Sequence, residues 1–297
     1  EVTGNGILGG ITAVQGATAG NNVCHYIQCV NNGDITATAT QAVSSSAMAG
    51  IAAFYSPGSV FEYCINTGFV TNTKSVYTAG IAANNKGSAT ADYPVVFKGC
   101  VNTGNIASSA QQIAGIVAYI TNYTSVDSCL NYGTIEQGIW GAAGICYTMA
   151  GTTSSLTNCI NYGDVSVTQY NAGGIVGNCA STTAVIENCV NVGNITSTTT
   201  AEKNNYGVGG IAGSSYATMK NCFNAGKVVG KLRVGGIVGS PSYYAKVART
   251  QLVNCVNVGL ITADEGCGGA LVGTTKGEEE KYWGDNNSCT NSYYLND

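Results

Sequence analysis

Short apolar segments alternate with polar turns along the chain, and one pattern of positions recurs within them. In the segment NCVNVGNI (188–195), a cysteine is followed by asparagine at +2, glycine at +4 and a branched aliphatic residue at +6. Eight copies keep all of these positions, at spacings of 29 to 36 residues, and this regularity predicts a stack of repeated units. The cysteines are Cys29, Cys64, Cys100, Cys129, Cys159, Cys189, Cys222 and Cys255, and the asparagines are Asn31, Asn66, Asn102, Asn131, Asn161, Asn191, Asn224 and Asn257.

A second apolar signature, a Gly-Ile pair, alternates with the first. It changes to Gly269-Ala270 in the last copy, and a weakened ninth copy of the first signature keeps Cys289, Asn291 and Leu295. Each repeat therefore carries two apolar β-type segments, with the length variation in Ser/Thr/Gly-rich stretches between them. The glycines of the pairs are Gly10, Gly50, Gly80, Gly115, Gly144, Gly174, Gly210 and Gly236.

The residue types in these segments predict strands. Gly, Thr, Asn and β-branched residues dominate and are poor in helix interiors, which excludes helical repeats. A propeller blade would need hairpin turns that the segments do not show. We therefore expect an all-β protein, a parallel β-solenoid of about nine coils, roughly 43 Å long at about 4.8 Å per coil. Residues 1–297 form a single domain in this interpretation, with the last coil and a cap at about 265–297, within a longer protein.

In such a stack, equivalent residues form columns, and the chemistry of each column predicts its place. Apolar residues fill positions −3 and +1, so we expect both columns inside. Because +1 and +6 differ in parity, a bend between them is required, and the +2 asparagine and +4 glycine tolerate the left-handed backbone that a bend needs. We expect the asparagines to form a ladder that bonds turn amides and one another. We expect the cysteines to be buried free thiols, with disulfides and metal binding as alternatives.

The pairing of GGIVGS (235–240) with LVNCVNVGLI (252–261) resembles the GLUG-motif repeats of bacterial secreted and cell-surface proteins. The resemblance covers essentially the whole chain and extends to the pectate-lyase-like right-handed β-helix superfamily. It implies a single-stranded right-handed parallel β-helix, extracellular or on the bacterial cell surface. The motif implies no catalytic residues.

Composition and charge narrow the functional classes. Only 9% of the residues are charged and the net charge is −4, so a basic face for nucleic acid is not expected. The chain contains no apolar stretch of about 18 residues, so we expect no membrane insertion in this segment. His25 is the only histidine, which argues against His-based zinc sites and a Ser-His-Asp triad. We expect no cofactor, no metal and no catalytic residue.

The charged residues do not gather as a polysaccharide-cleaving site requires. Asp34 and Asp164 share a column but stand four coils, about 19 Å, apart, too far for paired acid-base work. We interpret two further groups as surface charge, and Glu278, Glu279 and Glu280 as a solvated capping loop. The first group is the −2 column with Glu62, Lys98, Asp127, Thr157, Glu187 and Lys220, and the second is Lys227, Lys231, Arg233, Lys246 and Arg249 against Asp264 and Glu265.

Aromatic residues in register offer the one candidate binding feature. Trp140, Tyr170 and Tyr206 fall on three consecutive coils, and Tyr132 and Tyr162 stack at +3. Such a strip could bind sugars, or it could simply cover the coil edges. The expected function is a non-enzymatic stalk or adhesion module, with host or bacterial surface glycans or proteins as partners. The alternatives are a carbohydrate-binding or carbohydrate-cleaving β-helix and a mere spacer.

Overall fold

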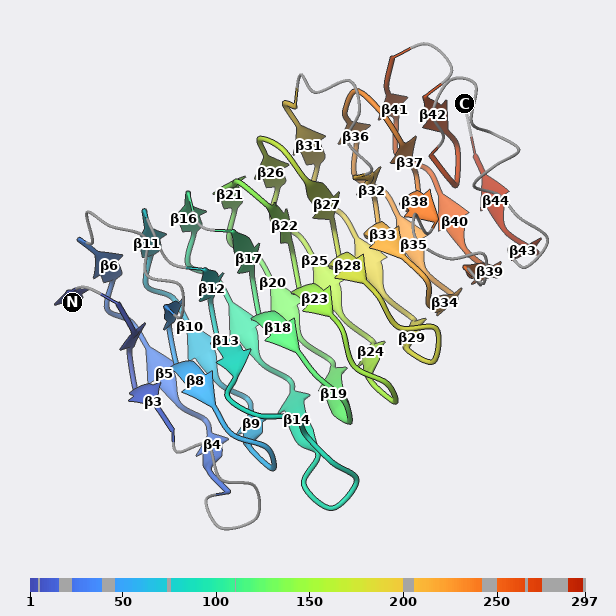
Figure 1. Cartoon of the computed structure of the whole chain (residues 1–297). Coiled ribbons are helices and arrows are strands. Elements are labelled where there is room, and N and C mark those ends of the chain that lie inside the picture. The colour runs from blue at the N-terminus through green and yellow to red at the C-terminus, as the bar shows by residue number, and fades with distance from the viewer. Residues whose placement is uncertain are drawn as a thin grey trace.

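In the computed structural model, the chain winds into a parallel β-solenoid, with the N-terminus and C-terminus at opposite ends of a rod (Figure 1). The structure describes residues 1–4, 6–15, 23–38, 46–73, 76–109, 111–199, 206–241, 250–264, 267–273 and 288–295, and these contain strands but no helix. Each turn contributes up to five short strands. Each strand as far as β37 (Val234–Gly235) pairs in parallel with the strand five places later, while β39 (Gln251–Val253) and β40 (Val256–Asn257) pair with β43 (Ser288–Thr290) and β44 (Tyr293–Tyr294). The expected all-β parallel β-solenoid is confirmed.

Five sheets, A to E, run along the rod. Four of them have nine strands, seven of which are paired on both sides, and sheet C has eight. Sheet A contains β1 (Val2–Gly4), β6 (Ile35–Ala37), β11 (Val70–Asn72), β16 (Ile106–Ser108), β21 (Ile135–Gly138), β26 (Val165–Val167), β31 (Ile195–Ser197), β36 (Val228–Val229) and β41 (Ile261–Thr262). Sheet B contains β2 (Leu8–Gly9), β7 (Ala47–Ala49), β12 (Tyr77–Ala79), β17 (Gln112–Ala114), β22 (Gly141–Ala143), β27 (Asn171–Gly173), β32 (Val208–Gly209), β37 (Val234–Gly235) and β42 (Gly268–Gly269).

The other three sheets complete each turn. Sheet C contains β3 (Thr12–Val14), β8 (Ala52–Tyr55), β13 (Ala82–Asn85), β18 (Val117–Ile120), β23 (Cys146–Met149), β28 (Val176–Cys179), β33 (Ala212–Ser215) and β38 (Val238–Pro241). Sheet D contains β4 (His25–Ile27), β9 (Val60–Glu62), β14 (Val95–Lys98), β19 (Thr124–Asp127), β24 (Ser155–Thr157), β29 (Val185–Glu187), β34 (Thr218–Lys220), β39 (Gln251–Val253) and β43 (Ser288–Thr290). Sheet E contains β5 (Val30–Asn31), β10 (Ile65–Asn66), β15 (Val101–Asn102), β20 (Leu130–Asn131), β25 (Ile160–Asn161), β30 (Val190–Asn191), β35 (Phe223–Asn224), β40 (Val256–Asn257) and β44 (Tyr293–Tyr294).

The buried asparagines of sheet E form the expected ladder. Nδ2 of each asparagine from Asn31 to Asn224 donates to Oδ1 of the asparagine in the next coil, at 2.7 to 2.8 Å in all seven steps. The same amide group donates to the carbonyl oxygen of the +4 glycine in its own coil, for example Asn161 to Gly163 at 2.7 Å. Both amide hydrogens are thereby used, which satisfies polar groups that would otherwise be costly to bury.

The asparagine ladder also explains the Gly-Ile signature. A β carbon on Gly10 would lie 2.6 Å from Oδ1 of Asn31, and the later Gly-Ile glycines meet the asparagine of their own coil in the same way. At this contact the two sides of each turn come close together, and this divides the buried apolar residues into two cores. One core, with Ile51, Phe61 and Cys64, lies on the side of sheets C and D, and a second core, with Ile35 and Met48, lies between sheets A and B.

The position of the bend differs from the expectation. The residue at −1, before the cysteine, has the left-handed backbone conformation in every copy, for example Asn188 with φ 54° and Asn221 with φ 52°, whereas the +2 asparagines and +4 glycines do not. Because the bend falls between −3 and the cysteine, positions 0, +2, +4 and +6 all point inward with one parity. The +1 column therefore points outward, and the prediction that it is interior was wrong: Val30 is 47% exposed while Asn31 is buried.

The register of the last copy also differs from the expectation. Cys289 pairs with Leu252, three positions before the cysteine position, and Tyr294 pairs with Asn257. Ser292 therefore takes the place of the column cysteine, and Asn291, with φ 45°, takes the left-handed position. The apparent match of Cys289 and Asn291 to the motif was off by three residues.

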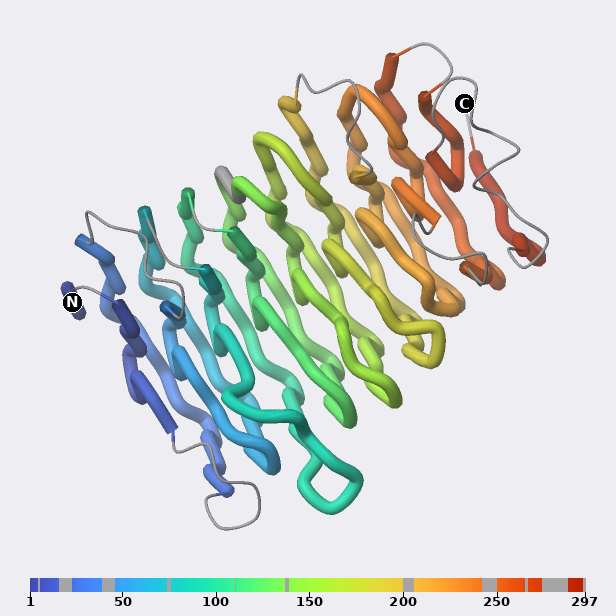
Figure 2. Tube along the Cα trace, viewed as in Figure 1, coloured from blue at the N-terminus to red at the C-terminus, as the bar shows by residue number. Residues whose placement is uncertain are grey.

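Loops leave the rod between strands and keep the stack intact. The segment 86–94, between β13 and β14, stands out from the side of the rod (Figure 2). Insertions are tolerated at such corners because the strands on either side keep their in-register partners.

Candidate functional site

Trp140, Tyr170 and Tyr206 lie together at the corner between sheets A and B. The ring centroids of Trp140 and Tyr170 are 5.6 Å apart in a stacked arrangement, and Tyr206 meets the Tyr170 ring edge-on at 4.0 Å. Trp140 is 44% exposed. The structure therefore brings the three predicted aromatic residues into one cluster, which we call the aromatic corner.

A fourth aromatic residue, Tyr147, which the sequence did not suggest, contacts the aromatic corner from the buried side. Tyr147 is buried, and its hydroxyl donates to the carbonyl oxygen of Trp140 at 2.7 Å. Burial raises the pKa of Tyr147, with the nearby hydroxyls of Tyr206 and Tyr170 adding to the effect. Gly177 has no side chain and so leaves room for the Tyr147 ring. This glycine was the sequence signal that could have indicated a buried ring at Tyr147.

Tyr132 and Tyr162 form a separate stack at the corner between sheets E and A. Their rings are nearly parallel, with an interplanar angle of 3° and centroids 4.7 Å apart. Both remain exposed, at 49% and 42%. The faces that these two rings turn toward each other are covered, so their edges and outer faces are what a ligand would meet.

The two carboxylates that share a column stabilise the backbone. Oδ1 of Asp34 accepts a hydrogen bond from the amide of Phe69 at 2.9 Å, and Oδ1 of Asp164 accepts one from the amide of Asn194 at 2.7 Å. Each carboxylate thus accepts a hydrogen bond from a backbone amide of the next coil, which is a structural role.

Asp127, in the −2 column, is held in its ionised form. It accepts hydrogen bonds from Thr157 at 2.7 Å, Asn158 at 2.8 Å and Ser128 at 3.0 Å. Partial desolvation raises the pKa of Asp127, but these hydrogen bonds and the charge of Lys98 outweigh it and the net shift is downward. A carboxyl group with a lowered pKa is poorly suited to act as a general acid near neutral pH.

Among the C-terminal charges, Arg233 is buried, so its interpretation as surface charge was wrong, and Lys231 and Asp264 lie on neighbouring coils. The amide of Asp264 donates to the carbonyl oxygen of Lys231 at 3.1 Å, so these residues are neighbours, although the register predicted from the Gly-Ile pairs was wrong by one residue: Gly269 pairs with Gly235 and not with Gly236. Lys246, Arg249, Glu265 and the Glu278–Glu280 run lie outside the described residues.

All thirteen cysteines are free in the structure. From Cys64 to Cys255 the column cysteines are buried, and Sγ of Cys64 lies 3.1 Å from the carbonyl oxygen of Tyr26 in the preceding coil. Burial raises the pKa of the Cys129 and Cys146 thiols, so they remain protonated and unreactive. Within the described ranges, no group of three or more His, Cys, Asp or Glu side chains is placed to hold a metal ion.

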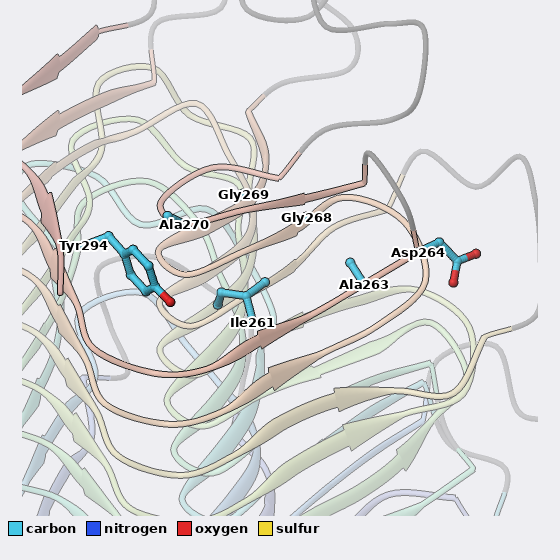
Figure 3. Close-up of a pocket in the computed structure, with 7 residues that line it drawn as sticks. All are labelled: Ile261, Ala263, Asp264, Gly268, Gly269, Ala270 and Tyr294. Carbon is cyan, nitrogen blue, oxygen red and sulfur yellow. The ribbon is translucent and has the colours of Figure 1, made fainter. Parts of the chain in front are cut away.

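A pocket of about 340 Å³ opens at the C-terminal end of the core (Figure 3). Tyr294 stands at one side of it and Asp264 at the other, with Ile261 between them. Among the described residues that line the pocket, Asp264 is the only carboxylate, so these residues do not form the pair of carboxylates that a glycosidase uses.

The outer face of sheet E carries a feature that the sequence interpretation placed inside the protein. Its outward column is apolar in all nine strands and is partly exposed, because successive residues cover one another. We call it the outer column; it consists of Val30, Ile65, Val101, Leu130, Ile160, Val190, Phe223, Val256 and Tyr293. From Val30 to Val256, each residue of the outer column directly precedes a buried asparagine, and successive side chains in a strand point to opposite faces. This alternation was the sequence signal that could have placed the outer column outside.

No protein-family model matches the chain, and comparisons with curated proteins and with solved structures give no significant match. Within the part of the chain that the structure describes, no helix has the length and apolar character needed to cross a membrane.

Proposed function

We propose that this chain is a non-enzymatic stalk or adhesion module of a secreted or surface-anchored bacterial protein. In this proposal it is a right-handed β-helix of about nine coils from a GLUG-motif repeat region, located outside the cell. Its partners are surface glycans or proteins, bound without a cofactor.

The observation that carries the proposal is the continuous asparagine ladder. The residues that repeat most strictly are fully occupied by internal contacts: each amide bonds the next coil and its own turn, and each Gly-Ile glycine lies against that amide. Repeated residues thus maintain a rod, and recognition falls to outward positions that vary. A rod held by the same contacts at every step is suited to present a binding surface at a distance.

The aromatic corner is the best candidate for the binding surface. Trp140 offers an exposed, uncharged ring, and Tyr170 and Tyr206 extend the surface over the next two coils. Sugars bind to exposed aromatic surfaces through their apolar faces, while tyrosine hydroxyls supply hydrogen bonds. This arrangement favours glycan binding over mere spacing, and it also supports the second candidate function, a carbohydrate-binding β-helix.

A glycan array with the whole chain tests this proposal. We expect wild type to bind a restricted set of glycans and Tyr170→Ala to lose that binding by about tenfold or more. Phe69→Ala is the matched control, because Phe69 is 53% exposed and belongs to neither aromatic stack. Absence of glycan binding by wild type, or equal losses in both variants, would reject glycan recognition at the aromatic corner.

A further inference from the structure

The outer face of sheet E, from the left-handed −1 position to the +3 position, is uncharged in every coil. Three columns form it: the left-handed −1 residues, the outer column, and the +3 residues. None of the 27 residues in these columns is charged. From the fourth coil onward the +3 column is also apolar and exposed, and it consists of Tyr132, Tyr162, Val192, Ala225, Val258 and Leu295.

The outward column of sheet A is mixed, since it includes Glu136 as well as the apolar Ala107 and Val229, whereas the outer column of sheet E is apolar in every strand. On sheet A, the outward residues paired in register include Thr36, Thr71, Ser166 and Thr196. Among the described strands, those of sheet E contact chiefly their neighbours in the same sheet. An exposed apolar strip of this length is a signature of an interaction surface.

The spacing of the outer column selects the kind of partner. Its side chains repeat at the interstrand distance of about 4.8 Å over eight steps, roughly 38 Å in all. An extended peptide repeats its same-side residues at about 6.8 Å and a helix has a pitch of about 5.4 Å, so both lose register within a few coils. A second parallel β-solenoid with the same period can interdigitate at every coil, as facing sheets do in a steric zipper.

We propose that two copies of this chain pack against each other through the outer face of sheet E and form a dimer. The closed symmetry of a dimer requires a self-complementary patch, which a neutral apolar strip provides. The contact would cover on the order of 550 Å² on each copy, from a strip roughly 38 Å by 14 Å. The total of roughly 1,100 Å² is near the lower limit for a specific interface, so the dimer dissociates at micromolar concentrations.

The charges bordering the strip favour parallel rods. In an antiparallel dimer centred on the coil of Ile160, the −2 columns face each other, which places Asp127 opposite Glu187 and Lys98 opposite Lys220. In a parallel dimer the −2 column faces the +5 column, where Asp127 meets Thr134 and Glu187 meets Asn194. The parallel arrangement leaves a single like pair, Lys220 with Lys227, and avoids the repulsion that like charges cause at an interface.

Sedimentation velocity over a range of protein concentrations tests the dimer. Ile160 lies in the fifth of nine strands and faces its counterpart in either orientation, so Ile160→Lys should raise the dimer Kd by about tenfold or more. Ile160→Thr keeps a β-branched residue in the strand and should weaken the dimer without unfolding the chain. Ser166→Lys adds the same charge on sheet A in the same coil, and its Kd should stay within about twofold of wild type.

The orientation is measured by energy transfer between fluorophores on the two N-terminal amines. Parallel rods bring the labels together and give strong transfer, whereas antiparallel rods separate them by roughly 38 Å and contradict the charge argument. A wild-type chain that stays monomeric up to about 200 µM overturns the dimer proposal, as does an Ile160→Lys chain that dimerises like wild type.

Discussion

The side-chain amide of Asn161 fills the space where a side chain on Gly144 would begin. A β carbon on Gly144 would overlap Cγ and Oδ1 of Asn161, and the same pair of residues meets in every one of the eight motif-bearing coils. The two signatures of the repeat are therefore two halves of one contact. Each glycine is required because the asparagine ladder runs through the middle of the coil.

The +4 glycine should be essential only where a coil lies beneath it. A β carbon on Gly163 would overlap the carbonyl oxygen of Gly133 in the preceding coil, whereas on Gly33 the nearest atom is the Glu1 nitrogen at 3.2 Å. We expect Gly163→Ala to lower the free energy of unfolding by about 1–3 kcal/mol or more, and Gly33→Ala by less than about 1 kcal/mol. Urea denaturation of the two variants measures the difference, and equal losses would contradict the stacking explanation.

The left-handed corner before each cysteine gives a second stability prediction. Asn221 has φ 52° and an exposed side chain. A β-branched residue is strained in this conformation, so Asn221→Val should cost about 1–2 kcal/mol of unfolding free energy. Glycine tolerates the left-handed conformation, so Asn221→Gly should change the unfolding free energy by less than about 1 kcal/mol. Thermal unfolding monitored by circular dichroism ranks the variants; a valine variant as stable as the glycine variant would disprove a left-handed corner.

Buried thiols should make the fold sensitive to alkaline pH. Burial raises the pKa of Cys179 to about 11, although hydrogen bonds at Ser181 and Ser215 lower it in part. An unfolded thiol has a pKa of about 8.5. Below about pH 8.5 the thiol is protonated in both the folded and the unfolded chain, and its contribution to stability is complete. Above about pH 8.5 the thiol ionises first in the unfolded chain, so the free energy of unfolding falls. The fall ends when the folded thiol also ionises, near pH 11.

The alanine variant at this position isolates that contribution. Between pH 8 and pH 10, wild type should lose roughly 2 kcal/mol more unfolding free energy than Cys179→Ala. Chemical denaturation at the two pH values measures the loss. An identical loss in both proteins would show that this thiol does not ionise on unfolding in that range.

The sequence was sufficient for the architecture because a solenoid repeats its constraints. The spacing of the motif established the parallel stack, and the amide chemistry of the +2 residue predicted the bonds from Asn131 to Asn161 and from Asn161 to Gly163. Each inference could be checked against eight copies. Parallel pairing of equivalent residues then followed from the repeat itself.

The orientation of single columns was harder to predict because apolar character alone does not distinguish inside from outside. The outer column was assigned to the core since Ile160 and Val190 are apolar, yet the bend at −1 turns them outward. A left-handed Asn158 or Ser128 resembles an ordinary polar corner residue in sequence. In the last copy, Cys289 matched the motif by letter while its strand pairs three residues away.

The aromatic corner was predicted only in part. Register brought Trp140, Tyr170 and Tyr206 together, but the support from Tyr147 depends on a hydrogen bond to a backbone carbonyl that no spacing rule specifies.

The central claim is that the repeated asparagine serves the fold from inside the rod, and two asparagines three residues apart test it. Asn161→Ala removes bonds to Asn131, Asn191 and Gly163, each a buried polar group, so we expect a loss of about 3–5 kcal/mol in unfolding free energy. Asn158→Gly keeps the left-handed corner and removes only exposed side-chain hydrogen bonds, so its loss should be less than about 1 kcal/mol. The measurement is the urea midpoint of each variant beside wild type. A large drop for Asn161→Ala alone is the predicted result, and equal midpoints for the two variants would contradict the internal ladder.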